Sequence, residues 1–216
     1  MSNLKGVGVA LVTPFNEDLS VDFDSLTRLV EYNIENGTNY LVVLGTTAEA
    51  ATLSAAEKQE VIKHVIKINN KRLPLVLGIG GNNTLEVKKQ IEEADLTDFD
   101  AVISVSPYYN KPNQEGLYQH YKMLASTGKQ IIIYNVPGRT GQNIEASTTL
   151  RLANEFPNLF MIKEAAPNIL QYFDILRKKP ANFSLVSGDD EYTLPVTLAG
   201  GDGVISVIGQ GYPKEF

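Results

Sequence analysis

Lys163 is the residue in this chain whose position most invites a chemical interpretation. It follows the apolar run Phe160–Ile162 and stands directly before Glu164, and Pro167 then breaks the segment. Because a buried strand tolerates lysine poorly, the run indicates either a strand that leaves for water at Lys163 or an amine held in a pocket at the end of a buried strand. In the second case a neutral amine could attack a ketone and form a Schiff base.

Schiff-base chemistry also needs a proton carrier close to the amine. At an unperturbed pKa of ~10.4, only about one lysine in a few thousand is neutral at pH 7, and burial raises that fraction. Carbinolamine formation and dehydration then require a group that both donates and accepts a proton, which a tyrosine or threonine hydroxyl can do. Tyr134, Thr46 and Tyr109 follow three other apolar runs and supply these residue types.

The composition is that of an ordinary globular protein and argues against two kinds of partner. The chain has 216 residues, 43% hydrophobic and 20% charged, with a net charge of −6. Because no run of Lys or Arg stands out, a nucleic acid or an anionic membrane has no electrostatic support as a partner. The N-terminus indicates a first strand rather than a signal peptide, and no stretch approaches about 18 apolar residues, so we expect a cytoplasmic protein.

Thiol and metal chemistry also have little support. The absence of Cys excludes a disulfide framework and thiolate catalysis. His64 and His120 fall within predicted helices, where we expect solvated surface positions, and no histidine falls at a strand end. Asp189 and Asp190 could hold Mg²⁺, but an acidic turn before a helix is the simpler interpretation. We therefore predict no metal site.

Eight short apolar runs, each ending in small or polar residues, predict eight strands. Their continuous apolarity, in place of strict alternation, indicates parallel strands buried on both faces. The runs are Gly6–Pro14, Tyr40–Thr47, Leu73–Gly81, Ala101–Tyr109, Gln130–Pro137, Phe160–Ala165, Phe183–Asp190 and Gly203–Gly209.

The segments between these runs have the periodicity of amphipathic helices. Ser54 opens the second helix with a capping box, and Thr84, Asn113 and Asn168 are candidate N-caps of the third, fourth and sixth helices. The helix after the fifth strand is expected over Ala146 to Phe156.

Alternating strands and helices predict an α/β fold with a single (β/α)₈ barrel domain over residues 1–216. A doubly wound sheet is the alternative, but no G-x-G-x-x-G turn follows the first strand. The eighth predicted strand lies so close to the end of the sequence that no eighth helix can follow it. We expect either that a partner covers this strand or that the sequence is a truncated product.

In such barrels the carboxyl ends of the strands carry the active site, so the residues at the eight strand ends should converge. Arg139 and Gly188 belong to this set. Taken singly, the members have ordinary explanations: Thr46 in a turn, Tyr109 in a packing patch at the rim, Arg139 as a solvated loop charge. Gathered around Lys163, they favour Schiff-base chemistry in a barrel mouth.

Seven separated motifs resemble those of the dihydrodipicolinate synthase family, within the superfamily of pyruvate-dependent class I aldolases and N-acetylneuraminate lyases. They run in order through essentially the whole chain: VGVALVTPF, GTTAEAATLS, VSPYYNKPNQEGLYQHY, IIIYNVPGRTG, MIKEA, SGDDEYTLP and GGDGVISV. The resemblance implies a (β/α)₈ TIM barrel with a C-terminal helical domain, and this chain lacks that domain and the eighth barrel helix.

The resemblance implies a catalytic role for four residues. Lys163 is expected to form the Schiff base with pyruvate, Tyr134 to donate and accept the proton, and Thr46 to relay it. Tyr109 is expected to complete the relay by crossing a dimer interface into the neighbouring subunit's site. Self-association as a homodimer or homotetramer is therefore implied as well.

The resemblance also implies how the substrates are held. Thr47 would bind the pyruvate carboxylate, with Gly188 and the main chain of Ile205 as further substrate contacts. Arg139 would hold the carboxylate of the second substrate, aspartate semialdehyde, and a guanidinium fork suits that pairing. Since the neuraminate lyases usually lack this arginine, Arg139 is the residue most informative about substrate choice.

A regulatory pocket for lysine, found in some members, is matched here by Asn82, Glu86 and Tyr108. Ala55 and Lys58 stand where those members carry histidines, which argues against inhibition by lysine.

Three further residues depart from the family motifs. Ala48 and Ala50 replace a glycine and a serine, and Ala48 would be strained if the glycine has a positive φ. Pro167 stiffens the loop after the catalytic strand.

Together these features predict a lyase that condenses pyruvate with aspartate semialdehyde on the pathway to lysine and diaminopimelate. The imine acts as the electron sink, so no organic cofactor or metal is expected. A related sugar-acid aldolase and a catalytically impaired barrel that only binds ligand are the alternatives. A phosphosugar aldolase is disfavoured, because Asp189 and Asp190 would repel a phosphate.

Overall fold

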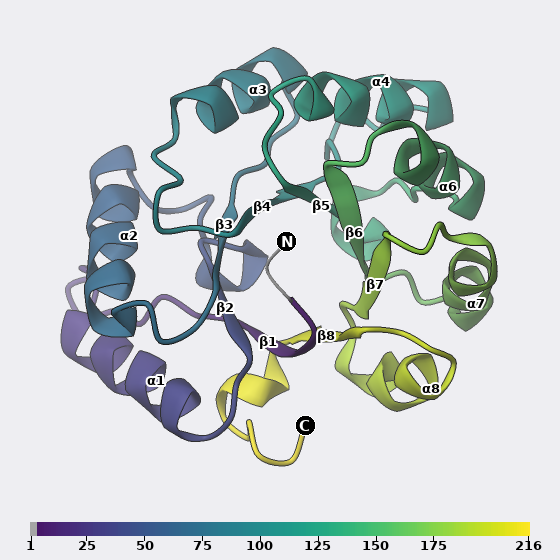
Figure 1. The fold of residues 1–216 in the computed structure, drawn as a ribbon. Helices are drawn as coiled ribbons and strands as arrows, with labels where there is room; N and C mark the ends of the chain where they lie inside the picture. Colours follow the sequence, from purple (N-terminus) through teal and green to yellow (C-terminus); the bar gives the residue numbers. More distant parts are fainter. Residues whose placement is uncertain (1–3) are drawn as a thin grey trace.

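The computed structural model describes residues 4–216, which form a closed barrel of eight parallel strands in sequence order. Neighbouring strands pair all round, and β1 pairs with β8 to close the barrel (Figure 1). This topology confirms the predicted barrel and excludes the doubly wound sheet. The strands are β1 (Gly6–Ala10), β2 (Tyr40–Val43), β3 (Leu75–Gly78), β4 (Ala101–Val105), β5 (Ile131–Asn135), β6 (Leu159–Glu164), β7 (Ser184–Ser187) and β8 (Gly203–Ser206).

Helices form the outer ring of the barrel (Figure 1). The α-helices are α1 (Phe23–Glu35), α2 (Ala55–Asn69), α3 (Thr84–Glu93), α4 (Gln114–Ala125), α5 (Pro137–Thr140), α6 (Ala146–Glu155), α7 (Ile169–Lys178) and α8 (Thr193–Leu198). Three 3₁₀ turns complete the set: η1 (Thr46–Ala48), η2 (Asp190–Tyr192) and η3 (Ile208–Gln210). No helix of the described residues is both long and apolar enough to cross a membrane.

The helix starts follow the capping residues in the sequence, with one shift. Ser54 forms the predicted capping box at the start of α2, and the Asn113 side chain accepts a hydrogen bond at the start of α4. The prediction of Thr84 as an N-cap was wrong by one residue, because Asn83 caps α3 and Thr84 is its first helical residue. Asn168 stands at the N-cap position of α7, but its side chain makes no capping hydrogen bond there.

Two layers of buried side chains hold the barrel together. One fills the interior of the barrel and includes Ile132, Tyr134, Met161, Val186 and Ile205. The other lies between the strands and the surrounding helices. The strands are therefore buried on both faces, as their unbroken apolar runs predicted.

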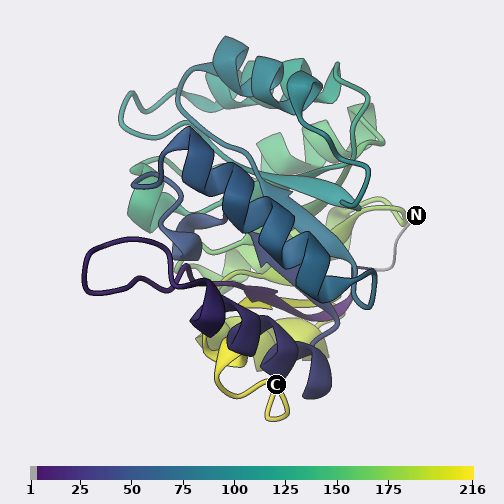
Figure 2. The same cartoon turned by 90° about the vertical axis from the view of Figure 1, so that its left-hand side faces the viewer.

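Most strands end earlier than the apolar runs predicted, and the residues beyond them build the mouth loops. Thr46 lies in η1, Tyr109 lies in the β4–α4 loop, and Asp190 begins η2. The β1–α1 loop extends from the body of the barrel, where the bridge between Phe15 and Val21 closes it (Figure 2). The mouth is thus made of short turns fixed to the strand ends.

After β8 the described chain forms η3 and a turn. This segment lies between α8 and α1 (Figure 1). Its Gln210 side chain accepts a hydrogen bond from Val12 N at 3.0 Å, and Tyr32 donates to Gly211 O at 3.1 Å. The segment is therefore attached to β1 and α1.

Candidate active site

Lys163 and Tyr134 meet inside the mouth of the barrel. They are partners in register across β6 and β5, and the Lys163 Nζ lies 4.4 Å from the centroid of the Tyr134 ring. Both side chains are buried, with exposed fractions of 5% and 7%. The strand therefore does not leave for water at Lys163. Of the two interpretations of this lysine, the amine held at the end of a buried strand is the correct one.

Burial makes the Lys163 amine easier to deprotonate. It lowers the pKa of Lys163 from 10.5 to about 8, with the charge of Asp190 opposing the shift and that of Arg139 adding to it. The physical cause is the loss of water around the ammonium, which disfavours the charged form. At neutral pH roughly a tenth of the amine is then neutral and nucleophilic.

Tyr134 has two neighbours that favour proton transfer. Burial raises the pKa of its hydroxyl, while the Thr46 hydroxyl and the charge of Arg139 act in the opposite direction. Thr46 lies in η1 after β2, so a residue from a distant part of the sequence influences the pKa of Tyr134 and lines the same cavity. The structure thus brings together three of the predicted residues: Lys163, Tyr134 and Thr46.

A cavity of about 960 Å³ opens above this group. Lys163, Tyr134, Thr46 and Arg139 contribute to its wall, together with apolar side chains of β2, β3 and β4. The cavity also runs outward between α2 and α3, where Lys58 forms part of its lining. An apolar chamber with a few convergent polar groups is typical of a small-molecule site.

Gly188 lies directly against the Lys163 side chain. A Cβ at this position would stand 2.9 Å from Cε and Cγ of Lys163 and 2.8 Å from Cβ of Ala165. Only a glycine leaves room for the lysine in this conformation. The predicted substrate contact at Gly188 stays a prediction, but its packing against Lys163 is a feature that the sequence did not reveal.

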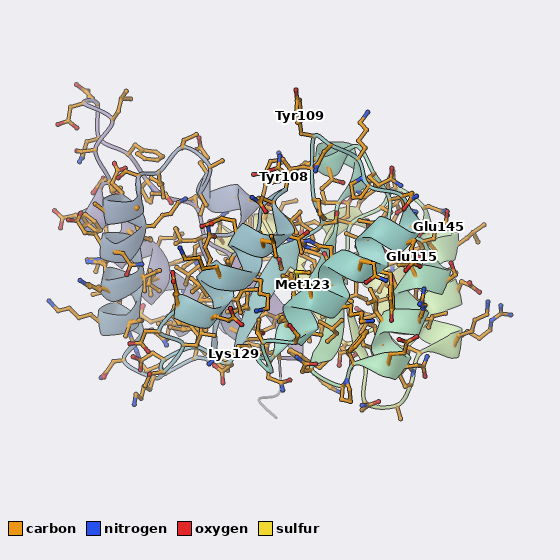
Figure 3. All side chains as sticks on the ribbon, turned by 90° about the horizontal axis from the view of Figure 1, so that it is seen from above. Tyr108, Tyr109, Glu115, Met123, Lys129 and Glu145 are labelled. Carbon is orange, nitrogen blue, oxygen red and sulfur yellow. The ribbon has the colours of Figure 1, made fainter. Side chains whose placement is uncertain are left out.

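Tyr109 does not join the group within this chain. Its side chain is 88% exposed and projects from the mouth end of the barrel, opposite Lys129 (Figure 3). Its φ of 73° places the residue in the left-handed region, which is uncommon outside glycine. Neighbouring Tyr108 turns the other way and lines the cavity.

Two predicted pyruvate contacts lie close to the site without lining the cavity. Thr47 is half-buried in η1 beside Thr46. Ile205 is fully buried in β8 and belongs to the interior layer, paired with Gly8 of β1.

The predicted regulatory residues are only partly gathered. Asn82 and Glu86 are exposed, and the Asn82 carbonyl accepts a hydrogen bond from Asn110 at 3.3 Å. Tyr108, Ala55 and Lys58 line the cavity, whereas Asn82 and Glu86 do not.

Ala48 is not strained in the way that its replacement of a glycine suggested. It is buried inside η1, and its carbonyl accepts a hydrogen bond from the Thr13 hydroxyl at 2.8 Å. The left-handed φ falls instead on Glu49, at 53°, and on Leu44, at 56°. Ala48 itself is not among the residues with a positive φ, so the strain considered for that case does not arise in this chain.

The expectation that both histidines are solvated was also wrong. His120 is 2% exposed in α4, where Nδ1 lies 2.8 Å from the Thr84 hydroxyl, and burial lowers its pKa to about 4. His64 is half-buried and lies 2.7 Å from the Thr27 hydroxyl. Both histidines lie in helices, as predicted, but their side chains are less exposed than predicted.

In the acidic pair after β7, the Asp190 side chain bonds to the backbone. The Asp190 carboxylate accepts hydrogen bonds from Val207 N at 3.2 Å and Ile208 N at 3.0 Å, which joins η2 to the turn after β8. Within residues 4–216, no group of three or more His, Cys, Asp or Glu residues is arranged to hold a metal ion.

A buried carboxylate next to Lys163 was not predicted from the sequence. Glu164 is fully buried and accepts hydrogen bonds from Asn135 and Gln171. The signal was present in the sequence, because consecutive residues of a strand point to opposite faces. With Lys163 inside the barrel, Glu164 had to lie beneath the helices.

The chain is similar to known proteins over nearly its whole length. A model of the dihydrodipicolinate synthetase family matches residues 3–215. A relative from Flavobacterium psychrophilum, named 4-hydroxy-tetrahydrodipicolinate synthase, is 59% identical over 212 residues, which are 98% of this chain and 72% of the relative. A relative of the same name from Parabacteroides distasonis is 54% identical over 99% of this chain and 72% of its own length.

Solved structures give the same result. The crystal structure of dihydrodipicolinate synthase from Thermotoga maritima superimposes with a TM-score of 0.95 at 41% identity, covering 99% of this chain and 74% of that one. The match of one family model to nearly the whole chain, together with relatives well above half identity, establishes the relationship. This chain belongs to the dihydrodipicolinate synthetase family.

Proposed function

We propose that this chain is a lyase that condenses pyruvate with L-aspartate-4-semialdehyde through a Schiff base on Lys163. The product would be 4-hydroxy-tetrahydrodipicolinate, on the route to lysine and diaminopimelate. The observation that carries the proposal is the buried Lys163 amine, with its lowered pKa, against Tyr134 at the cavity wall. It is supported by the relatives named 4-hydroxy-tetrahydrodipicolinate synthase and by a 45% identical synthase from Acinetobacter baumannii whose crystal structure is complexed with pyruvate, with a TM-score of 0.93 over 98% of this chain and 72% of that one.

The first half of the reaction activates pyruvate. The neutral Lys163 amine attacks the ketone carbon and forms a carbinolamine, and loss of one water gives the iminium. The Tyr134 hydroxyl protonates the departing oxygen and is reprotonated through Thr46. The methyl carbon then loses a proton. The electron pair of that C–H bond forms the carbon–carbon double bond of an enamine, and the iminium nitrogen accepts the π electrons of the C=N bond.

The second half joins the two substrates. The enamine carbon attacks the aldehyde carbon of aspartate semialdehyde, the new carbon–carbon bond forms, and the aldehyde oxygen takes up a proton. The amino group of the semialdehyde next attacks the imine carbon and displaces the Lys163 amine, which closes the ring. One water is released in the whole sequence, and the enzyme is regenerated.

One arginine, one threonine and the chain at two further residues are assigned to substrate binding in this proposal. Arg139 binds the carboxylate of the semialdehyde, since its guanidinium lies at the cavity wall and is close enough to influence both Lys163 and Tyr134. Thr47 and the chain around Gly188 and Ile205 bind pyruvate.

Tyr109 is assigned to the site of a second copy of the chain. Its exposed ring and left-handed backbone keep it away from Lys163 of its own chain, so it can act in proton relay only in an associated form. We therefore infer self-association through the mouth end that carries Tyr109.

A substrate panel tests the proposed function. The full chain is incubated with pyruvate and either aspartate semialdehyde or a sugar aldehyde, and products are identified by mass spectrometry, with Lys163→Met as the control. We expect product only with aspartate semialdehyde and only with Lys163 present. Preferential turnover of the sugar aldehyde would contradict the proposed substrate, and product formation by the Lys163→Met variant would contradict the mechanism.

A further inference from the structure

Glu164 is a fully buried acidic residue that the reaction itself does not use. It follows Lys163 in β6, and its side chain points to the opposite face of the strand, where Gln171 of α7 bonds to it. None of the ion pairs in the described part of the chain involves Glu164. A buried carboxylate without a cation is unfavourable unless other groups compensate for the lost water.

Four hydrogen bonds from N–H groups compensate in part: burial raises the pKa of Glu164 to about 7, and these hydrogen bonds act against that rise. Asn135 Nδ2 donates to both carboxylate oxygens, at 2.8 Å and 3.0 Å. Ala166 N donates to Oε1 at 2.8 Å, and Gln171 Nε2 donates to Oε2 at 2.8 Å. Because every partner is a donor, the ionised carboxylate satisfies all of them at once.

The donors are themselves held in place by their neighbours. Asn135 Oδ1 accepts a hydrogen bond from Ile144 N at 3.0 Å, which fixes the orientation of its amide. Asn143 Nδ2 donates to Gln171 Oε1 at 2.9 Å, and Asn135 Nδ2 lies 2.8 Å from Asn143 Oδ1. The network thus ties the ends of β5 and β6 to the 141–145 loop and to α7.

This network lies one residue from the reacting pair. Asn135 and Glu164 are register partners, directly after the partners Tyr134 and Lys163. The Glu164 carbonyl accepts from Gly188 N at 2.7 Å, and Gly188 packs against Lys163. Any rotation of this strand end would move the amine relative to the tyrosine ring.

We propose that Glu164 is a positioning residue, whose carboxylate fixes the ends of β5 and β6 so that the Lys163 amine stays over Tyr134. A glutamine of the same shape cannot replace it, because its NH₂ group would face N–H donors of Asn135, Ala166 or Gln171. The inference rests on the proposed function, since it concerns the geometry of Schiff-base formation.

The test compares Glu164→Gln with a variant that loses buried hydrogen bonds far from the site. Asn69 is 2% exposed and lies at the end of the barrel opposite the mouth. Its Nδ2 donates to Leu73 O, and its Oδ1 accepts from Leu73 N. Asn69→Ala is therefore the control for a purely structural loss. Each full-length variant is mixed with a series of pyruvate concentrations and borohydride, and the rate of adduct formation at Lys163 is measured alongside its Tm.

We expect Glu164→Gln to lower the saturating rate of adduct formation about tenfold or more, with the half-saturating pyruvate concentration changed less than about threefold. Asn69→Ala should lower the Tm and leave the saturating rate near that of the unsubstituted chain. A folded Glu164→Gln variant with an unchanged rate, or equal losses of rate in both variants, would overturn the inference.

Gln171→Met provides a milder second variant, which keeps the inference testable if Glu164→Gln does not fold. It removes one donor to Oε2 and should lower the saturating rate about threefold, and an unchanged rate would contradict the positioning role. Absence of any adduct in the unsubstituted chain would instead overturn the proposed function, and the inference with it.

Discussion

The Lys163 amine and the Tyr134 ring face each other because Lys163 and Tyr134 are paired in register across β6 and β5. Strand pairing, not a loop, sets their separation of 4.4 Å between Nζ and the ring centroid. Residues on strands are held more rigidly than residues on loops, which suits a step in which a proton must move over a short distance. The other candidate residues reach this pair from short turns at the strand ends.

The rate of imine formation should follow the ionisation of Lys163. Burial lowers the pKa of this amine to about 8, and only its neutral form attacks a ketone. The rate of borohydride-trapped adduct formation with saturating pyruvate should therefore rise with pH through about 8 and become constant above it. A rate that continues to rise to about pH 10 would mean that the amine is not shielded from water.

Lys163→Met should make the protein more stable at pH 7. A lysine whose pKa is about 8 folded and 10.5 unfolded destabilises the fold below pH 8, by on the order of 3 kcal/mol. The penalty shrinks as pH rises from 8 to 10.5, because the unfolded chain there binds more protons than the folded one. Thermal unfolding should show a Tm several degrees above that of the unsubstituted chain at pH 7, with a smaller difference near pH 10. A lower Tm at pH 7 would show that the amine makes favourable contacts that outweigh its burial.

Arg139→Ala should weaken the binding of aspartate semialdehyde and leave the reaction with pyruvate nearly unchanged. Loss of a charged hydrogen-bond donor is expected to raise the KM for aspartate semialdehyde about tenfold to a hundredfold and to leave adduct formation at saturating pyruvate within about threefold. The same change should move the pH midpoint of adduct formation upward, because the charge of Arg139 lowers the pKa of Lys163. Arg177→Ala, a surface arginine of α7, is the control. An unchanged KM for the semialdehyde would show that Arg139 does not bind this substrate.

Gly188→Ala should displace the Lys163 side chain from its position beside Tyr134. The added methyl would stand 2.9 Å from two Lys163 side-chain carbons, so the lysine must move. We expect adduct formation to slow about tenfold or more. Gly138→Ala is the matched control, because no atom lies within 4 Å of a Cβ at that position. Equal rates in the two variants would show that the Lys163 conformation can adapt.

Much of the fold could be predicted because its signals are local. Eight unbroken apolar runs indicated eight strands buried on both faces, and the capping box at Ser54 marked the start of α2. Lys163 and Tyr134 were identifiable as candidates because strand ends converge in a barrel. The short α5 was missed, since Pro137 was interpreted only as the end of a strand, although proline also begins helices.

The remainder depends on packing that no local pattern encodes. His120 was placed on the wrong side of α4, because a helix wheel does not show which residues the neighbouring helix covers. Gly188, directly after β7, packs against Lys163 of β6, and Tyr109 has a left-handed backbone in the β4–α4 loop; neither feature has a local sequence pattern. Glu164 shows the opposite case, where alternation along β6 already determined that the carboxylate would be buried.

The most direct test of the account is to trap the imine. The full chain is treated with pyruvate and borohydride, digested, and searched by mass spectrometry for the reduced adduct, with Lys163→Met as the control. We expect one adduct in the unsubstituted chain, on the peptide that contains Lys163, and no adduct in the Lys163→Met variant. An adduct on another lysine, or none on the Lys163 peptide of the folded unsubstituted chain, would contradict the Schiff-base mechanism.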